Sequence, residues 1–240
     1  MTNTSKNKKL YTKIWKVKKI KSHKFWSTWT EFRKIIPRQK SNLLDIGCGI
    51  RPRIPVKNSY FVDLSESALN ILEKYGGHCY CGDAKNLPYK SGFFDFINAS
   101  EVLEHIKQDE LVIREIKRVL KPNGYFSFSV PMNMKYWSKF DDIVNHMRRY
   151  SPEELYNKIN NNGLKIQSYC MNEPTKSKVY KNIASVVLKK FPKLAVFIEE
   201  YITLPISERI QKINDRKWLC DKFIENLTNA SGVIIICQKI

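Results

Sequence analysis

The sequence of 240 residues contains few acidic residues, no long apolar run and no regularly spaced cysteines. No stretch approaches the ~18–20 apolar residues of a membrane span. The charged amino-terminal stretch also lacks the apolar segment of a secretory signal. The six cysteines do not have zinc-finger spacing, so free and buried thiols in a reducing compartment are expected. These absences predict a cytoplasmic protein, in which any membrane contact is peripheral.

Basic residues are concentrated at the start of the chain, which has 42 Lys and Arg against 23 Asp and Glu. Residues 1–40 contain 13 Lys and Arg and one acidic residue, Glu31, whereas residues 41–171 contain 17 basic and 15 acidic residues. Residues 1–40 are therefore predicted to form a basic arm that could bind an anionic membrane surface, a nucleic acid or an acidic partner. An AT-rich genome, which favours Lys, Asn and Ile codons, explains the charge equally well.

Hydrophobic periodicity predicts a helical arm followed by an α/β fold. Apolar residues recur every three or four positions from Lys6 to Pro37, as in a helix. After Pro37, short apolar runs alternate with helical patterns, which is typical of a parallel sheet covered by helices on both faces. The predicted strands are 42–46, 60–63, 78–81, 93–99, 125–130, 164–170 and 233–238, and helices are predicted over 65–75, 109–120 and 151–160.

Polar residues and glycines follow the first four predicted strands, at the edge where ligands bind in open parallel sheets. Gly47-Cys48-Gly49 can bring backbone N–H groups close to a ligand. Asp63 can accept hydrogen bonds from a ribose diol, and Asp83 from the exocyclic amine of an adenine. Ser100 and Glu101 follow the fourth strand. Taken singly, each feature is also explained without a ligand, as a tight turn or an acidic residue at a helix start.

Six segments occur in the order and at the spacing of one family's motifs. They are Leu44-Asp45-Ile46-Gly47-Cys48-Gly49, Asp63-Leu64-Ser65, Gly82-Asp83-Ala84, Phe94-Asp95-Phe96-Ile97, Glu101-Val102-Leu103-Glu104-His105-Ile106 and Arg118-Val119-Leu120-Lys121-Pro122-Asn123-Gly124. Over residues 41–171 the chain thus resembles the class I S-adenosylmethionine-dependent methyltransferases, in the branch of quinone and small-molecule methyltransferases.

The resemblance implies a Rossmann-like seven-stranded sheet with a reversed last strand, in which 164–170 and 233–238 form an antiparallel pair. It also implies S-adenosyl-L-methionine as the cofactor. By the same resemblance, the cofactor-binding residues are Asp45, Gly47, Cys48, Gly49, Asp63, Leu64, Asp83, Ala84, Ser100 and Glu101.

The sequence departs from this family after the first strand. Family members usually carry a third glycine and a full helix there, but this chain has Arg51 and only ten residues, 50–59, before the second strand. Because a parallel crossover usually takes a dozen or more residues, the first crossover helix is predicted to be missing or reduced to a turn. Arg51 or Arg53 could bind the carboxylate of the cofactor, or could be solvated. A dinucleotide dehydrogenase is disfavoured, since its fingerprint requires glycine at Pro52.

Two histidines are candidates for the base that a hydroxyl or amine acceptor requires. His105 follows the fourth strand, and His146 lies in the loop after the fifth. Glu101, Glu104 and His105 also resemble the metal motif of some quinone O-methyltransferases and small-RNA methyltransferases. The same letters occur in metal-free relatives, so no metal ligand is assigned. His146 could instead hold its loop to the sheet edge.

The chain is expected to comprise the arm 1–40, a core 41–171, a helical lid or insertion 172–231 and a last strand within 232–240. An apolar lid and a Trp-rich basic arm favour methyl transfer to a small-molecule or lipid-like substrate. One alternative is a nucleic-acid methyltransferase that uses the arm, and another is a non-catalytic cofactor-binding protein. Against the first alternative, Ser100-Glu101-Val102-Leu103 stands where base N-methylating relatives carry Asn/Asp-Pro-Pro-Tyr/Phe.

Overall fold

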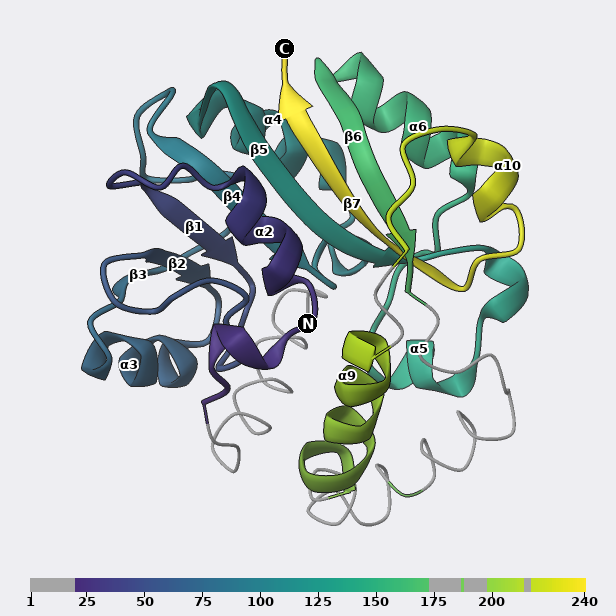
Figure 1. The fold of residues 1–240 in the computed structure, drawn as a ribbon, viewed down its shortest axis with the longest axis horizontal. Coiled ribbons are helices and arrows are strands. Elements are labelled where there is room, and N and C mark those ends of the chain that lie inside the picture. Colours follow the sequence, from purple (N-terminus) through teal and green to yellow (C-terminus); the bar gives the residue numbers. More distant parts are fainter. Residues whose placement is uncertain (1–19, 173–186, 188–197, 214–216) are drawn as a thin grey trace.

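Seven strands form one mixed sheet in the computed structural model, which describes residues 20–172, 187, 198–213 and 217–240 (Figure 1). The strand order is β3-β2-β1-β4-β5-β7-β6. The strands are β1 Leu43–Ile46, β2 Tyr60–Asp63, β3 His78–Cys81, β4 Phe94–Ser100, β5 Leu120–Pro131, β6 Leu164–Met171 and β7 Gly232–Lys239. Strand β7 is antiparallel to both of its neighbours, and all other pairs are parallel. The predicted sheet with a reversed last strand is confirmed.

The central strands are apolar on both faces because helices cover both sides of the sheet. Leu43 and Phe61 belong to the apolar core on one face, while Leu44 and Val62 belong to the core on the other. This alternation follows from the two-residue period of a strand. It explains why buried parallel strands are continuous apolar runs in the sequence.

Each face of the sheet has its own set of helices. Helices α2 Trp29–Ile35 and α3 Glu66–Lys74 pack on one face, through residues such as Phe32 and Leu72. The opposite face is covered by α4 Asp109–Val119, α6 Pro152–Asn161 and α10 Phe223–Leu227. Figure 1 shows α2 in front of the sheet and α4 behind it. Helices on both faces are therefore confirmed.

The crossover after β1 contains no helix between residues 47 and 59, as its length predicted. The amino-terminal segment packs against this loop instead. The indole Nε1 of the buried Trp26 donates to the Pro52 carbonyl at 2.9 Å, and the Lys21 amide donates to the Ile50 carbonyl at 3.2 Å. The Arg53 guanidinium lies 3.4 Å from the Trp26 ring centre, which is a cation–π contact. The part of the arm next to the core thus supports the shortened crossover.

The prediction of one continuous helix from Lys6 to Pro37 is wrong for the described part of that segment. A short 3-10 helix, η1 His23–Phe25, is separated from α2 by three buried residues, 26–28. The chain turns there because Trp26 is drawn into its contact with Pro52. Residues 1–19 of the predicted helix lie outside the described residues.

Strand β5 also begins five residues before its predicted start. The Lys121-Pro122-Asn123-Gly124 segment lies between the predicted helix 109–120 and the predicted strand 125–130, but in the structure it falls within β5. Asn123 has a φ of 60°, and the pairing with β4 shifts register between Phe94 and Phe96. The turn residues are therefore accommodated by an irregularity in the ladder. Leu120 pairs with Phe94 and Tyr125 pairs with Phe96, so residues 121–124 form an unpaired bulge within β5.

The described part of the insertion contains the π-helical turn Glu199–Thr203, α9 Leu204–Ile213 and α10. In Figure 1, α9 lies beyond the carboxyl ends of β4 and β5. The Ser27 amide donates to Glu208 Oε2 at 2.8 Å, which fixes α9 to the amino-terminal segment. The predicted lid residues 173–186, 188–197 and 214–216 lie outside the described part of the chain.

Two further expectations concern cysteines and membranes. None of the six cysteines forms a disulfide, as predicted, but Cys81 and Cys220 are exposed, so the expectation that every thiol is buried was wrong. Among the described residues, no helix has the length and apolarity needed to cross a bilayer.

Candidate active site

The glycine turn after β1 lies at the carboxyl edge of the sheet. Gly47 and Gly49 have φ values of 67° and 55°, in the left-handed region that glycine adopts without a steric cost. A Cβ at Gly47 would lie 2.6 Å from Cγ2 of Val102. Gly47 is nevertheless exposed on its other side. A side chain is thus excluded from a position where the backbone is open to a ligand.

Asp63 joins the glycine turn to the end of β2. Its Oδ2 accepts a hydrogen bond from the Gly49 amide at 2.9 Å, and its Oδ1 accepts one from the Ser65 amide at 2.8 Å. Burial raises the pKa of Asp63 above its ordinary value, while these amides oppose that shift. A carboxylate has about four lone-pair sites, so each oxygen retains the capacity to accept from a hydroxyl. Leu64, which follows it, is half-buried.

Asp83 lies on the neighbouring strand end, because the Gly82 amide donates to the Asp63 carbonyl at 3.1 Å. Its Oδ1 accepts from the Lys85 amide at 3.0 Å, and its Oδ2 lies 3.3 Å from Lys85 Nζ. The side chain is 41% exposed. Ala84 beside it is buried. Asp83 therefore keeps an accessible oxygen at the edge of the site.

Asp45 has a different environment from the other predicted cofactor residues. Its side chain is fully buried, with Oδ1 accepting from Asn98 Nδ2 at 2.6 Å and Oδ2 from the Arg53 amide at 2.7 Å. Burial raises the pKa of Asp45 to about 7, against the effect of these hydrogen bonds. Asp45 thus ties β1 to β4 and to the shortened crossover, and its carboxylate is used within the protein.

The end of β4 completes this edge. The Ser100 hydroxyl donates to Asn98 Oδ1 at 3.1 Å, and the exposed Glu101 accepts from the Ser129 hydroxyl at 2.6 Å. Glu101 has a φ of 56°, which is uncommon for a residue with a side chain. Cys48 is half-buried beside the glycine turn. The ten predicted cofactor residues therefore lie along one continuous edge, at the ends of β3, β2, β1 and β4.

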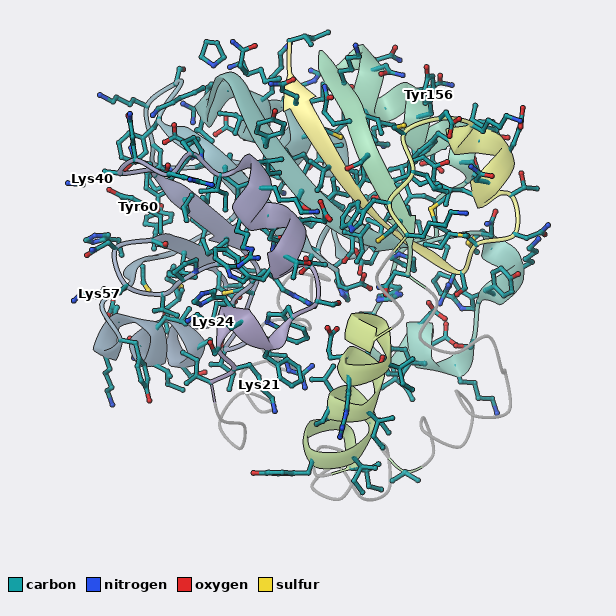
Figure 2. The ribbon with its side chains drawn as sticks, viewed as in Figure 1. Lys21, Lys24, Lys40, Lys57, Tyr60 and Tyr156 are labelled. Carbon is teal, nitrogen blue, oxygen red and sulfur yellow. The ribbon has the colours of Figure 1, made fainter. Side chains whose placement is uncertain are left out.

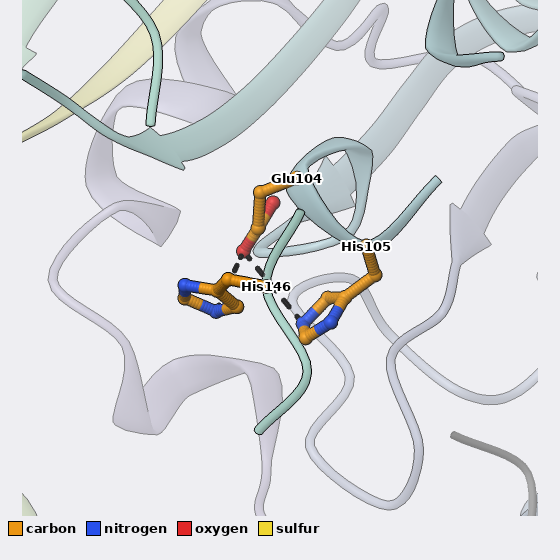
Figure 3. Close-up of side chains that lie close together, drawn as sticks. All are labelled: Glu104, His105 and His146. Atoms are coloured by element: carbon orange, nitrogen blue, oxygen red, sulfur yellow. Dashed lines mark ion pairs between the residues drawn. The ribbon is translucent and has the colours of Figure 1, made fainter. Parts of the chain in front are cut away.

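A second group of polar residues lies just after this edge. Glu104 and His105 belong to the 3-10 helix η2 Leu103–His105, and His146 lies in the loop after α5 Lys139–Ile143. Oε1 of Glu104 lies 3.7 Å from Nε2 of His146 and 3.9 Å from Nε2 of His105 (Figure 3). The two imidazole rings pack edge to face, with centroids 4.7 Å apart. The structure thus brings both predicted histidines together with one glutamate.

Glu104 is fully buried, and neither of its carboxylate oxygens has a hydrogen-bond partner among the described residues. Burial and the nearby Glu101 raise the pKa of Glu104 well above its ordinary value. Burial and His146 lower the pKa of His105 to about 3. An unpartnered buried carboxyl group costs about 1–3 kcal/mol or more, so its retention requires an explanation.

His146 is held in place by residues that the sequence reading did not select. Its Nδ1 lies 2.9 Å from Asp141 Oδ1, and Arg149 Nη2 lies 2.8 Å from the same oxygen. Asp141 and Ser138 form a capping box at the start of α5. The pKa of Asp141 is well below its usual range, because its bonds to His146, Arg149 and Ser138 outweigh its burial. The Ser-x-x-Asp signal at 138–141 was present in the sequence, but nothing in it indicated contact with His146.

A shallow depression elsewhere is not part of this arrangement. It is lined by residues that include Tyr60, His78 and Tyr89. Tyr60 and His78 are the first residues of β2 and β3, so the depression lies at the amino-terminal ends of these strands. Ligands of open parallel sheets bind at the opposite edge.

Comparison with known proteins agrees with the site. Residues 44–128 match the family profile described as a methyltransferase domain. Norajmaline N-methyltransferase from Rauvolfia serpentina is 33% identical over 103 residues, which cover 36% of this chain and 35% of that protein. The tRNA (carboxymethyluridine(34)-5-O)-methyltransferase of Arabidopsis thaliana is 27% identical over 133 residues, which cover 53% of this chain and 31% of that protein. The chain thus spans about a third of the length of these two relatives.

Solved structures share the fold over nearly the whole chain. An S-adenosylmethionine-dependent methyltransferase from Thermotoga maritima superposes with a TM-score of 0.56 at 18% identity, covering 91% of both chains. Geranyl diphosphate C-methyltransferase from Streptomyces coelicolor A3(2), solved with Mg²⁺, geranyl diphosphate and S-adenosyl-L-homocysteine, superposes with a TM-score of 0.57 at 12% identity, covering 89% of this chain and 79% of that one.

The fold defines an α/β protein with a ligand edge at the carboxyl ends of β1 to β4. Residues 44–128 match a methyltransferase domain family, and the chain shares the fold of solved S-adenosylmethionine-dependent methyltransferases. Both findings agree with the family that the sequence motifs resembled.

Proposed function

We propose that the chain transfers a methyl group from S-adenosylmethionine to a hydroxyl or amine of a small-molecule or lipid-like substrate. The observation that carries this proposal is the arrangement of two adjacent groups. An open edge with exposed Gly47 and Glu101 lies next to the Glu104, His105 and His146 cluster. The first suits a cofactor, and the second suits the removal of a proton from the acceptor.

The residues at the open edge fit the cofactor. The Gly47–Gly49 turn presents backbone where no side chain fits, Asp63 retains lone pairs for a ribose diol, and Asp83 has an accessible oxygen for an adenine amine. We assign Asp45 a positioning role, because both of its oxygens are used within the protein. When bound, the cofactor supplies a sulfonium methyl group, whose bond to sulfur breaks as the bond to the acceptor forms.

The acceptor must lose a proton in this reaction, and the chain places His146 for that step. Its Nδ1 faces the Asp141 carboxylate and therefore carries the proton of a neutral ring, so the lone pair is on Nε2. Nε2 faces Glu104 and is near His105. We propose that the cluster acts on the acceptor proton through Nε2 of His146, with Asp141 as a positioning residue.

The substrate class is supported by α9. Its exposed large apolar side chains, with those of the preceding turn, are Tyr201, Ile202, Ile206 and Ile210. Such an apolar surface beyond the carboxyl ends of β4 and β5 would suit a substrate with an apolar part (Figure 1). The names of the relatives specify transfer to nitrogen, oxygen or carbon, so the choice of a hydroxyl or amine rests on the histidines and not on the relatives.

The test begins with calorimetric titration of S-adenosylmethionine and with mass spectrometry of ligands that co-purify with the chain. Transfer of labelled methyl groups is then measured on a lipid extract, a small-molecule extract and total RNA. Label in the small-molecule or lipid fraction supports the proposal. Cofactor binding without transfer to any fraction would instead indicate a non-catalytic cofactor-binding protein.

A nucleic-acid substrate is the second candidate, favoured by the basic residues near the start of the chain. Lys24, Lys40 and Lys57 are exposed, and Figure 2 shows them with Lys21 in the half of the molecule that holds β1 to β3. One relative is named as a tRNA methyltransferase. Label confined to the RNA fraction, and lost at high salt, would select this candidate.

A further inference from the structure

We infer that Glu104, His105 and His146 form a binding site for one divalent transition-metal cation. One ligand atom from each of these residues lies within 4.8 Å of the others (Figure 3). Two imidazoles and one carboxylate are a donor set that suits Zn²⁺, Mn²⁺ or Fe²⁺ better than Mg²⁺, which prefers oxygen. The cation site exists independently of the proposed function, but its role toward the acceptor rests on that function.

The orientation of the histidines supports the site. Nδ1 of His146 faces the Asp141 carboxylate at 2.9 Å, and Nδ1 of His105 faces the Asn145 carbonyl at 3.4 Å. Carboxylate and carbonyl oxygens only accept hydrogen bonds, so both rings carry their proton on Nδ1. Both Nε2 lone pairs then face Glu104. Metal-binding histidines are typically oriented in this way, with the second ring nitrogen donating to a carboxylate or carbonyl.

With both rings protonated on Nδ1, the three facing atoms are all acceptors. The Glu104 oxygens have no hydrogen-bond partner among the described residues. A protonated Glu104 would supply one hydrogen, but distances of 3.7 and 3.9 Å from Oε1 to the two Nε2 atoms are too long for hydrogen bonds. Four-coordinate cations with bonds of ~2.0–2.2 Å hold their ligands about 3.3–3.6 Å apart, so small side-chain rotations suffice to bind one. A bound cation would therefore satisfy the buried Glu104 carboxylate. A proton on Glu104 would not, because it could not form a hydrogen bond with either Nε2 atom at these distances.

The residues of the proposed site differ from those of the sequence motif formed by Glu101, Glu104 and His105. Glu101 accepts a hydrogen bond from Ser129 and does not belong to the group, whereas His146 comes from a loop some forty residues further along the chain. The side chains of His105 and His146 are 12% and 7% exposed, so the cluster has limited access to solvent. Three protein ligands leave a coordination position for an acceptor, whose hydroxyl a cation would make more acidic. With a cation bound, Nε2 of His146 is a ligand, so the cation and not the imidazole would promote loss of the acceptor proton.

The experiment measures metal binding directly, on the tag-free full-length chain after dialysis against chelator. Mn²⁺ is the main probe, followed by calorimetry and electron paramagnetic resonance, because exposed Cys81 and Cys220 could bind Zn²⁺ through sulfur. Co²⁺ absorption then reports the ligand type. We expect one equivalent of Mn²⁺ per chain and a Co²⁺ spectrum without a thiolate charge-transfer band.

Glu104→Gln and His146→Ala are each expected to weaken Mn²⁺ binding by at least ~10-fold. The matched controls Glu110→Gln and His78→Ala replace exposed residues outside the cluster and should bind as the wild type does. Circular dichroism checks folding, and His105→Asn serves if Glu104→Gln does not fold. Absence of Mn²⁺ binding by the wild type, or equal binding by the cluster variants, overturns the inference. Titration of S-adenosylmethionine into the same samples tests the cofactor site separately, so a failure of the proposed function is distinguishable.

Discussion

The two halves of the candidate site differ in how their polar groups are satisfied. At the cofactor edge, Asp63 and Asp45 accept hydrogen bonds from backbone amides and a neighbouring side chain. In the cluster of Glu104, His105 and His146, here called the acceptor cluster, the Glu104 carboxylate has no hydrogen-bond partner among the described residues, and the Nε2 lone pairs of both histidines point toward it. The cofactor half is therefore held in shape by the protein itself. In the proposed acceptor half, the Glu104 carboxylate remains for a further group to satisfy, so the two halves should respond differently to substitution.

The largest expected effect is on turnover, from His146→Ala. If His146 acts on the acceptor proton, either directly or through a cation, turnover should fall by ~10²-fold or more. Cofactor affinity should stay within a factor of a few, because His146 makes no contact with the cofactor edge in the described structure. Methyl-transfer kinetics and calorimetry on the same samples measure the two quantities. A variant that loses both together would mean that His146 is structural and that the halves are not independent.

The second prediction concerns the pH dependence of stability. Burial raises the pKa of Asp45 to about 7, whereas an unfolded aspartate titrates near ~3.9. Between these values the folded chain holds a proton that the unfolded chain has released, so the free energy of unfolding falls as pH rises from about 4 to 7. Relative to Asp45→Asn, the wild type should lose about 2–3 kcal/mol between pH 5 and pH 8.

Urea unfolding of both proteins without cofactor, followed by circular dichroism at several pH values, measures this difference. Any constant penalty from replacing the Asp45 hydrogen bonds cancels, because only the change with pH is compared. Parallel pH profiles would show that Asp45 is ionised throughout in the folded protein.

The sequence predicted most of the sheet because the strands are short apolar runs followed by glycine or aspartate. It failed where tertiary contacts decide the local structure. The segment at Pro122 and Gly124 has turn residues, yet it lies within β5, because the residues on either side of it, Leu120 and Tyr125, both pair with β4. The break between η1 and α2 depends on the contact of Trp26 with Pro52, which no local pattern encodes.

The same distinction applies to the site. The predicted cofactor residues follow parallel strands, which bring their carboxyl ends to one edge, so the proximity of these residues could be predicted. The partnership of His146 with Glu104 and Asp141 depends on how the loop after α5 folds back onto η2. The Met147 amide donates to the Glu104 carbonyl at 2.9 Å in that contact. Sequence analysis selected both histidines but could not place them together.

The third prediction tests the cofactor half directly. Asp63→Ala removes an acceptor for a ribose hydroxyl and leaves the amides of Gly49 and Ser65 without their partner. Cofactor affinity should weaken by ~1.5–3 kcal/mol, the usual contribution of hydrogen bonds to charged groups. Mn²⁺ binding at Glu104 should be unchanged if the halves are separate. Calorimetry measures both, and an unaltered cofactor affinity would remove the ribose assignment.

The smallest effect on cofactor binding is expected from deletion of residues 1–19 of the basic arm. Residues 1–19 carry seven lysines and no acidic residue. A chain that lacks them should bind S-adenosylmethionine within about twofold of the full chain, since the predicted cofactor residues all lie beyond residue 44. Its binding to anionic vesicles or RNA at low salt should weaken, and the difference from the full chain should fade as salt rises, because exposed charges are screened over ~10 Å at 0.1 M. A full-length control with all seven lysines replaced by glutamine separates charge from length. If the full chain binds neither vesicles nor RNA at low salt, the charge reflects codon usage, and the choice of substrate rests with the insertion and the acceptor cluster alone.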